Sequence, residues 1–235
     1  MRSQFPVLPH CRKYSPFVFE TQLYAPPAVR PTPPEGGSFP GHSLYLSERL
    51  PKLTMASDPE IYTIGHSTLA IDEFTGILTA NGIKLVVDVR TVPRSRANPQ
   101  FDKQSLPASL KTVGIEYKHF PCLGGLRKPR KDSPNTAWVN SSFRGYADYM
   151  LTEEFEECLN GLLSLIATIS GGVTLMCAEA VPWRCHRSLI ADALYVRGLS
   201  VTHLVGKRGR RGHTLTKFAV VHGKTITYPN TESGS

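Results

Sequence analysis

The chain has 235 residues and a formal net charge of +8. Its hydrophobic fraction of 40% and charged fraction of 20% are ordinary for a globular protein, which excludes a wholly disordered or fibrous chain. No apolar run approaches the ~18 residues that a membrane-spanning helix needs, and no apolar signal core stands near the N-terminus. We therefore expect a cytoplasmic globular protein without a membrane partner.

Proline separates an N-terminal extension from the remainder of the chain. Ten of the 19 prolines lie in residues 1–54, which lack periodic apolar spacing and have the composition of a disordered linker. This stretch is either a flexible tail or sequence upstream of a true start at Met55. The second explanation is favoured because Met55 stands just before the first strand signal. Residues 55–235 are then one α/β domain, long enough to fold alone.

Charge and cysteine content limit the function classes. Residues 1–54 hold six basic and three acidic side chains, and residues 55–235 hold 21 and 16. The excess on the domain fits an anionic small molecule or nucleic acid, although a solvated basic surface gives the same count. Five cysteines at irregular spacing form a poor disulfide framework, which favours free thiols in a reducing compartment.

Strand and helix signals alternate from residue 60 onward. The β-rich run 61–64 predicts the first strand, and apolar residues at helical spacing from Phe74 predict a helix that ends at Asn81-Gly82. Residues 84–89 are nearly all apolar, as in a buried parallel strand. The next expected elements are a helix over 104–112, a strand over 115–120, a loop over 121–142 with the basic run 127–131, and helices over 146–150 and 153–169.

The C-terminal part continues the alternation. It predicts a strand over 173–176, a helix over 184–196, a strand over 201–205, a basic turn over 207–211, and a small hairpin of 218–221 with 225–228. Repeated strand-then-helix units predict a single three-layer α/β domain with a mostly parallel, Rossmann-like sheet and helices on both faces. Ligands of such sheets bind beyond the carboxyl ends of the strands.

Reactive residue types gather at these predicted strand ends. They are His66 and Ser67 after the first strand, Asp88, Arg90, Arg94, Ser95 and Arg96 at and after the second, Cys177 and Glu179 after the fourth, and Cys185, His186 and Arg187 where the next helix opens. Each residue alone is a weak signal. Their convergence on one edge of the sheet predicts a functional site there.

Cys177 is the first candidate for the chemistry. It follows a strand and precedes a helix N-terminus, where backbone N–H groups and the helix dipole stabilise a thiolate or bind an anion. Cysteine-dependent phosphatases use the same arrangement, but six residues separate Cys177 from Arg184, one more than their signature has, so that family is not assigned. A buried cysteine that only fills space remains an equal alternative.

Cys185 and His186 allow further interpretations. With Cys177 they could form a redox pair or, with His66, a zinc site of sulfur and nitrogen ligands. The spacing supports neither strongly, since structural zinc ligands come in pairs two to four residues apart. A structural role for Cys185 and local hydrogen bonds for both histidines stay open.

The carboxylates and arginines complete the candidate site. Asp88 at the end of an apolar strand needs a partner, so we expect it to hold an arginine in position, whereas Glu179 could pair with an arginine or act as a general acid or base. Arg90, Arg94 and Arg96 with Ser67 and Ser95 suit phosphate or carboxylate recognition, with a solvated basic face as the alternative. Phe143, Tyr146 and Tyr149 could stack on bases, but core packing is the favoured interpretation.

Five blocks of this sequence match a known family. They resemble, in order, the signature blocks of the family catalogued as domain of unknown function 488, across about residues 60–206. The blocks are Ile64-Gly65-His66-Ser67-Thr68, Val87-Asp88-Val89-Arg90 with Pro93-Arg94-Ser95-Arg96 and Pro99-Gln100-Phe101, Leu123-Gly124-Gly125, Phe143-Arg144-Gly145-Tyr146-Ala147, and Met176-Cys177-Ala178-Glu179 with Cys185-His186-Arg187-Ser188. The resemblance implies a compact α/β domain of prokaryotic, cytoplasmic type and no settled activity. The motif positions that it implies coincide with the strand-end residues.

These observations favour an enzyme with an arginine-lined, anion-binding cleft for a phosphate-bearing substrate such as a nucleotide or nucleic acid. In this hypothesis Arg90, Arg94, Arg96 and Arg187 hold the substrate, Cys177 is the nucleophile or redox thiol, and His66 or Glu179 carries the proton. The alternatives are a non-catalytic nucleotide- or nucleic-acid-binding module and a Cys/His zinc protein. The sequence requires no cofactor, and it predicts no oligomeric state.

Overall fold

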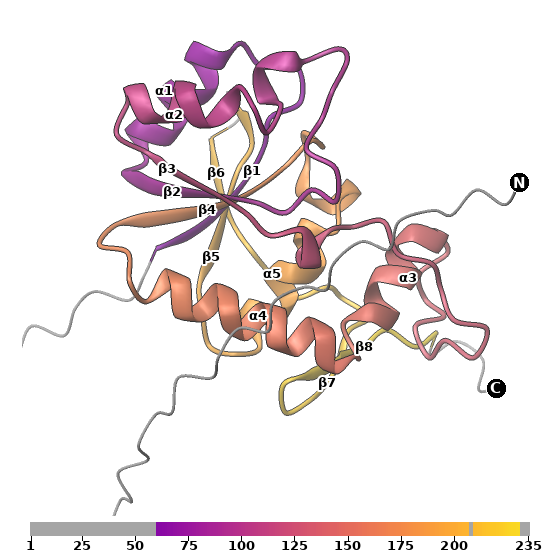
Figure 1. Ribbon diagram of the computed structural model, residues 1–235. Helices are drawn as coiled ribbons and strands as arrows, with labels where there is room; N and C mark the ends of the chain where they lie inside the picture. Colours follow the sequence, from indigo (N-terminus) through magenta and orange to yellow (C-terminus); the bar gives the residue numbers. More distant parts are fainter. Residues whose placement is uncertain (1–59, 207–208, 231–235) are drawn as a thin grey trace, which may run out of the picture. The chain divides into compact units, whose positions relative to one another are not determined.

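A six-stranded sheet is the centre of the computed structural model, which describes residues 60–206 and 209–230 (Figure 1). Its strand order is β3 (Glu116–His119), β2 (Ile83–Asp88), β4 (Gly172–Cys177), β1 (Ile61–Gly65), β5 (Val201–Leu204) and β6 (Arg210–Gly212). The first five strands are parallel, and β6 pairs antiparallel with β5. The predicted extension over residues 1–54 and the predicted start at Met55 lie outside the described residues.

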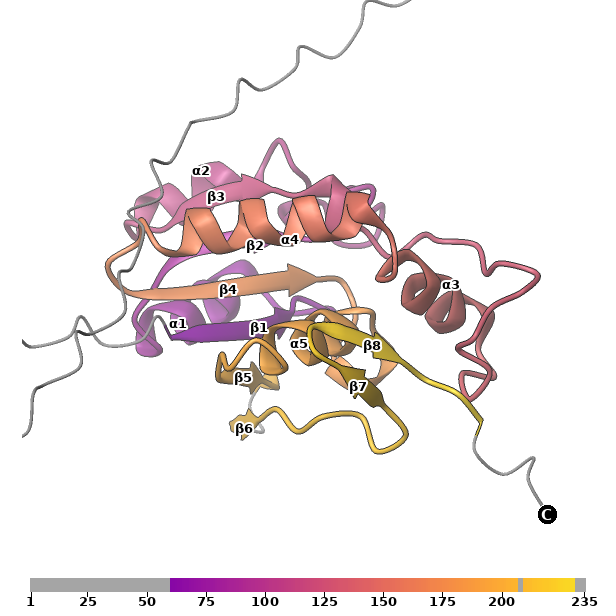
Figure 2. The same ribbon diagram turned by 90° about the horizontal axis from the view of Figure 1, so that it is seen from below.

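Helices cover both faces of this sheet (Figure 1, Figure 2). Helices α1 (Ile71–Ala80) and α2 (Leu106–Thr112) lie on one face, and α4 (Glu153–Ile166) and α5 (Arg187–Tyr195) lie on the other. The remaining elements are α3 (Ser141–Tyr149), the 3-10 turns η1 (Pro99–Phe101), η2 (Pro121–Leu123) and η3 (Pro182–Arg184), and a hairpin of β7 (Val220–His222) with β8 (Thr225–Thr227). The predicted mixed α/β architecture with a mostly parallel sheet is confirmed.

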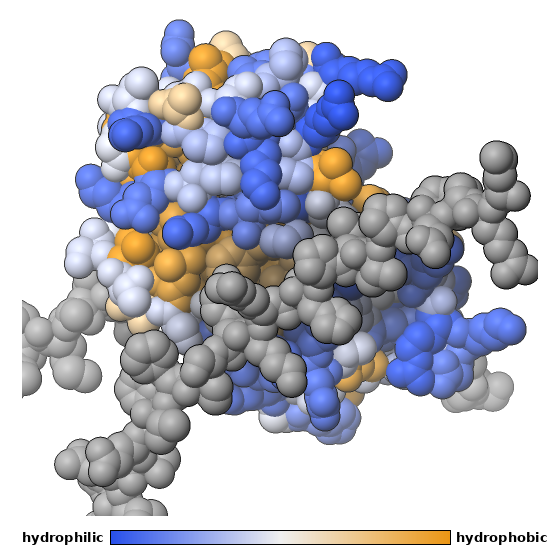
Figure 3. Space-filling model, viewed as in Figure 1, coloured by the Kyte–Doolittle hydropathy of each residue, from blue (hydrophilic) through white to orange (hydrophobic). Residues whose placement is uncertain are grey.

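Each face of the sheet buries its own apolar layer. Strand β2 supplies both layers, because Leu85 and Val87 pack toward α4 and α5 while Val86 packs with the residues of α1 and α2. A strand between two helical layers is apolar on both sides, and for this reason the nearly continuous apolar run 84–89 predicts a buried strand. On the surface shown in Figure 3, hydrophilic side chains predominate over α1 and α2 at the top of the view, and apolar side chains show in a band below them.

Three elements differ from the sequence prediction. Helix α3 begins at Ser141, five residues before the predicted start, because the Asn140 side chain accepts hydrogen bonds from two backbone N–H groups of its first turn. Helix α5 begins at Arg187, after the separate turn η3. Part of the predicted basic turn is strand β6, an exposed edge strand whose arginines carry no strand signal.

The cysteine prediction is wrong for two of the five residues. Cys122 of η2 and Cys158 of α4 form a disulfide, although 36 positions separate them. The pairing arises because η2 packs against α4, a contact that sequence spacing cannot show. Cys177 and Cys185 are free and buried, and Cys11 lies outside the described residues. Among the residues that the structure describes, no helix is both long and apolar enough to cross a membrane.

Candidate functional site

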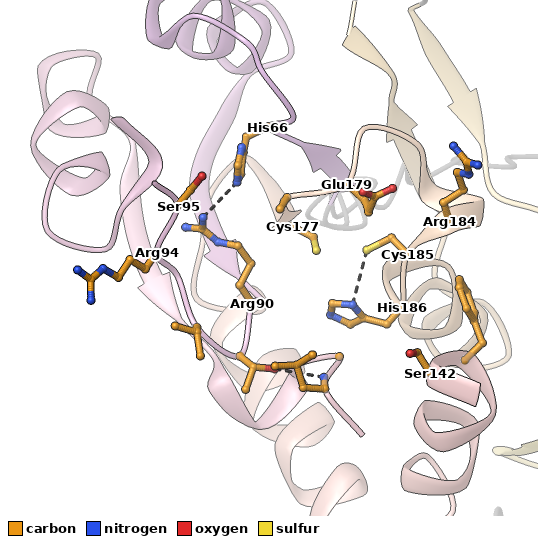
Figure 4. Close-up of a pocket in the computed structure, with 16 residues that line it drawn as sticks. His66, Arg90, Arg94, Ser95, Ser142, Cys177, Glu179, Arg184, Cys185 and His186 are labelled. Atoms are coloured by element: carbon orange, nitrogen blue, oxygen red, sulfur yellow. Dashed lines mark hydrogen bonds between the residues drawn. The ribbon is translucent and has the colours of Figure 1, made fainter. Parts of the chain in front are cut away.

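A cavity of about 390 Å³ opens at the carboxyl ends of β1, β2 and β4 (Figure 4). Eight of the predicted site residues line it, namely His66, Arg90, Arg94, Ser95, Cys177, Glu179, Cys185 and His186. Ser67, Asp88, Arg96 and Arg187 do not line the cavity. The lining residues that the sequence argument missed include Val92, Leu126 and Ser142, which lie on loops or at a helix start and carry no strand-end signal.

Asp88 holds Arg90 in a fixed position below the cavity. The Asp88 carboxylate is fully buried and accepts hydrogen bonds from the Arg90 backbone N–H (3.1 Å), Nε (2.9 Å) and Nη2 (2.6 Å). The Tyr117 hydroxyl donates to the same carboxylate at 2.8 Å, and Arg90 Nη2 also donates to the Phe101 carbonyl at 2.6 Å. Asp88 therefore positions an arginine, and the Arg90 charge is largely balanced by it.

His66 completes the arrangement around Arg90. Its Nδ1–H donates to the Ser67 carbonyl at 2.9 Å, so Nε2 is the nitrogen that accepts from Arg90 Nη1 at 3.1 Å. The ring stacks on Phe101 with a centroid distance of 4.2 Å. Burial lowers the pKa of His66 to about 4, and the Arg90 charge acts in the same direction. A neutral imidazole with both nitrogens engaged orients Arg90 and is poorly suited to carry a proton.

Ser67 owes its place to backbone geometry rather than to its hydroxyl group. Its φ of +45° lies in the left-handed region, which few residues other than glycine adopt. This conformation presents the Ser67 carbonyl to the His66 imidazole. The strained turn thereby fixes the tautomer of the histidine.

Cys177, Cys185 and His186 form a cluster at the floor of the cavity. One potential ligand atom from each lies within 4.8 Å of the others. His186 Nε2–H donates to the Val89 carbonyl at 3.0 Å, and Nδ1 lies 3.6 Å from Cys185 Sγ. A Cβ on Gly125 would lie 2.4 Å from that Nδ1, so only glycine leaves room for the imidazole.

The thiols of Cys177 and Cys185 differ in acidity. A hydrogen bond from Cys177 and the charge of Arg187 lower the pKa of Cys185 to about 6, against the effect of burial. The same hydrogen bond, with burial, raises the pKa of Cys177 to about 12. These opposite shifts make Cys185 the more acidic thiol of the pair and favour a single thiolate that shares the remaining proton.

Arg187 explains how a buried thiolate can persist. Its side chain is fully buried, and Nη2 donates to the Glu179 carbonyl at 2.6 Å, while Nε and Nη1 have no hydrogen-bond partner within residues 60–206 and 209–230. No acidic side chain in these ranges pairs with it, and its charge lowers the pKa of the Cys185 thiol. Gly65 admits this arginine, because a Cβ there would lie 2.8 Å from Nη2 and 1.6 Å from the Glu179 carbonyl oxygen.

The mouth of the cavity combines charge with apolar surface. Arg94 and Arg184 are exposed, and Figure 4 shows their guanidinium groups on opposite sides, pointing away from the thiols. Neither forms an ion pair with any described residue. Val92 and Leu126 line the cavity although 62% and 77% of their surfaces are exposed, so the mouth offers apolar contact as well.

The other predicted binding features lie away from the cavity floor. Arg96 is exposed and lines no part of it. Tyr146 and Tyr149 are buried, with hydroxyl groups that donate to the Leu123 and Cys122 carbonyls, which confirms core packing. Arg127 of the first basic run donates to the Cys122 and Gly124 carbonyls, and its guanidinium lies 3.5 Å from the centroid of the Tyr149 ring, so it is a structural residue.

Comparison with known proteins supports the resemblance seen in the sequence. No curated protein and no solved structure matches this chain. A family model matches residues 70–194, which is more than half of the chain and includes the Asp88 and Cys177 to Arg187 blocks. The matched family has no assigned activity. The chain belongs to the family described as Domain of unknown function DUF488.

Proposed function

We propose that the protein is an enzyme whose Cys185 thiolate attacks a phosphate-bearing substrate, such as a nucleotide, held in the cavity. The observation that carries this proposal is the fully buried Arg187 beside Cys185, without an acidic partner among the described residues. Burial of an unbalanced charge costs several kcal/mol, so the fold stabilises the thiolate form. A stabilised thiolate at the floor of a cavity is typical of a nucleophilic site.

The proposal moves the nucleophile from Cys177, where the sequence argument placed it, to Cys185. A pKa of about 12 keeps Cys177 protonated, and its S–H serves as a hydrogen-bond donor to the neighbouring thiolate. Cys185, with a pKa of about 6, is ionised at neutral pH. In the attack a sulfur–phosphorus bond forms as the bond to the leaving oxygen breaks, and that oxygen departs with the bonding electron pair and takes a proton from solvent water. Water then hydrolyses the intermediate, and His186 Nδ1, which faces Cys185 Sγ, is placed to accept the proton from that water.

Anion binding in this proposal depends on the mouth of the cavity. Arg94 and Arg184 have no acidic partner among the described residues, so their charges remain free to attract a phosphate group. Arg90 also lines the cavity, but Asp88 already balances its charge. Ser95 and Ser142 add hydroxyl groups to the lining, and these can bind phosphate oxygens.

Phosphate protection of Cys185 tests this proposal. Inorganic phosphate should slow alkylation of Cys185 in the wild-type protein, and Arg94→Ala with Arg184→Ala should remove the protection. Arg96→Ala, an exposed arginine outside the cavity, is the matched control and should retain it. Hydrolysis of an aryl phosphate should disappear in Cys185→Ser. Turnover that survives this change contradicts the assignment of Cys185 as the nucleophile. Protection of Cys185 by phosphate without any turnover favours a non-catalytic binding module.

A zinc site is a second candidate, because the cluster also has the geometry of metal ligands. A tetrahedral zinc with bonds of about 2.3 Å to sulfur and about 2.0–2.1 Å to nitrogen places those two atoms about 3.6 Å apart. Cys185 Sγ and His186 Nδ1 are 3.6 Å apart, and the Val89 carbonyl orients the imidazole from its other side. Stoichiometric zinc that is lost in Cys185→Ser supports this candidate. Metal-free protein with a titrating Cys185 supports the thiolate enzyme.

A further inference from the structure

Turn η3 separates the Cys185 cavity from a second cavity. The second cavity has a volume of about 280 Å³, and its lining includes Trp183, Ser188, Arg211 and Thr214. Arg184 lines the first cavity and Trp183 lines the second, although the two residues are neighbours in η3. A ligand that crosses η3 can therefore contact both cavities.

Trp183 is an unusual surface residue. Just over half of its side chain, 52%, is exposed, and the Arg211 guanidinium lies 5.7 Å from its ring centroid. An exposed tryptophan in a cavity, next to an arginine that forms no ion pair with the described residues, is typical of a site that stacks on a planar group. None of the residues that line this second cavity is acidic, so the surroundings also suit an anionic ligand.

Polar groups in the second cavity suit the edge of a base. The Ser188 hydroxyl donates to the Cys185 carbonyl, so its lone pairs remain available to a ligand donor. Thr214 is exposed, and its hydroxyl can donate or accept. These groups with Trp183 supply stacking and hydrogen bonding together.

We propose that the substrate is a nucleoside phosphate, with its base stacked on Trp183 in the second cavity and its phosphate at Arg184 in the first. This inference rests on the proposed function of the first cavity and names its substrate class. The chemistry is shared by a free nucleotide and by a nucleotide within a single strand. A phosphate ligand without a base lacks the contact with Trp183.

The chain contains two tryptophans, so fluorescence reports on the stacking directly. In the Trp138→Phe variant Trp183 is the sole reporter, and a nucleoside monophosphate should quench it. Ribose 5-phosphate should bind without quenching, and about 10-fold more weakly, since base stacking contributes about 1–3 kcal/mol. A short single-stranded oligonucleotide that binds more tightly than the monophosphate indicates that the natural source is a strand, and the reverse order indicates a free nucleotide.

Two substitutions distinguish the contribution of the base to binding from that of the phosphate. Trp183→Ala should weaken binding of the monophosphate about 10-fold and leave binding of ribose 5-phosphate unchanged. Arg184→Ala should weaken binding of both ligands. Val113→Ala is the control, because Val113 is an apolar residue that is 41% exposed and lines neither cavity. Equal affinity of Trp183→Ala and wild type for the monophosphate overturns this inference and leaves the proposed function intact. If no phosphate ligand protects Cys185, the proposed function fails as well.

Discussion

The ionisation of Cys185 can be measured directly through the pH dependence of its alkylation. With a pKa of about 6 against an ordinary 9.0, about 90% of Cys185 is thiolate at pH 7, compared with about 1% of an ordinary thiol. Alkylation by iodoacetamide, followed on the Cys185 peptide by mass spectrometry, should have its midpoint near pH 6. Cys122 and Cys158 are disulfide-bonded and do not compete.

The midpoint is a better measure than the rate at a single pH. Intrinsic nucleophilicity falls with thiol pKa, with a Brønsted coefficient of about 0.4–0.5, so a thiolate three units more acidic is about 15–30-fold less reactive. This loss cancels most of the roughly 90-fold gain in thiolate fraction at pH 7. Cys185 should therefore react only about 3–6-fold faster than an ordinary thiol, before any effect of limited access.

Two substitutions test the cause of the shift. Cys177→Ala removes the largest contribution, the S–H donor, and should raise the midpoint most. Arg187→Met removes the buried charge and should raise the midpoint by a smaller amount. Arg94→Ala, at the mouth of the cavity, should leave it unchanged. A wild-type midpoint near pH 9, or one that neither Cys177→Ala nor Arg187→Met moves, refutes the assignment of the thiolate to Cys185.

Four further changes test the scaffold around the site. Asp88→Asn leaves a buried arginine without its counterion and should cost about 3–5 kcal/mol in urea unfolding. Gly125→Ala places a Cβ 2.4 Å from an imidazole nitrogen and should cost about 1–3 kcal/mol while shifting the thiol midpoint. Opening the Cys122–Cys158 disulfide, by reductant or by a double serine variant, should cost about 4 kcal/mol for a loop of this length. Burial and a neighbouring histidine lower the pKa of His203 to about 3, so its stabilising contribution is present above about pH 6.5 and is lost as the pH falls toward 3. The contribution of His203 should make the free energy of unfolding about 2 kcal/mol lower at pH 5 than at pH 8, and His203→Asn should reduce this difference.

The sheet and the location of the site were predictable from the sequence because both follow from regular repeats. Apolar runs such as 84–89 mark parallel strands, and parallel strands bring their carboxyl ends to one edge of a sheet. His66, Arg90 and Cys177 are far apart in the chain but follow three strands of that edge, so their meeting in one cavity required no knowledge of side-chain packing.

The chemical roles within the cavity were less predictable, because they depend on contacts between side chains. Which of Cys177 and Cys185 keeps the proton is decided by a hydrogen bond between them and by the burial of Arg187. Trp183 gave no signal in the sequence, since only its exposure beside Arg211 distinguishes it from a core residue. The spacing of residues in a sequence shows neither which side chains are buried nor which thiol keeps a shared proton.

The placement of the arginines separates two electrostatic functions that net charge combines. Arg90 is balanced by Asp88, and Arg187 is buried and lowers the pKa of Cys185, so both charges act inside the fold. The attraction of a phosphate ligand then depends on the exposed Arg94 and Arg184, whose charges salt screens. Raising the ionic strength should therefore weaken phosphate protection of Cys185 while leaving its alkylation midpoint nearly unchanged. If the alkylation midpoint depends on salt as steeply as phosphate binding does, that result contradicts a buried Arg187–Cys185 pair.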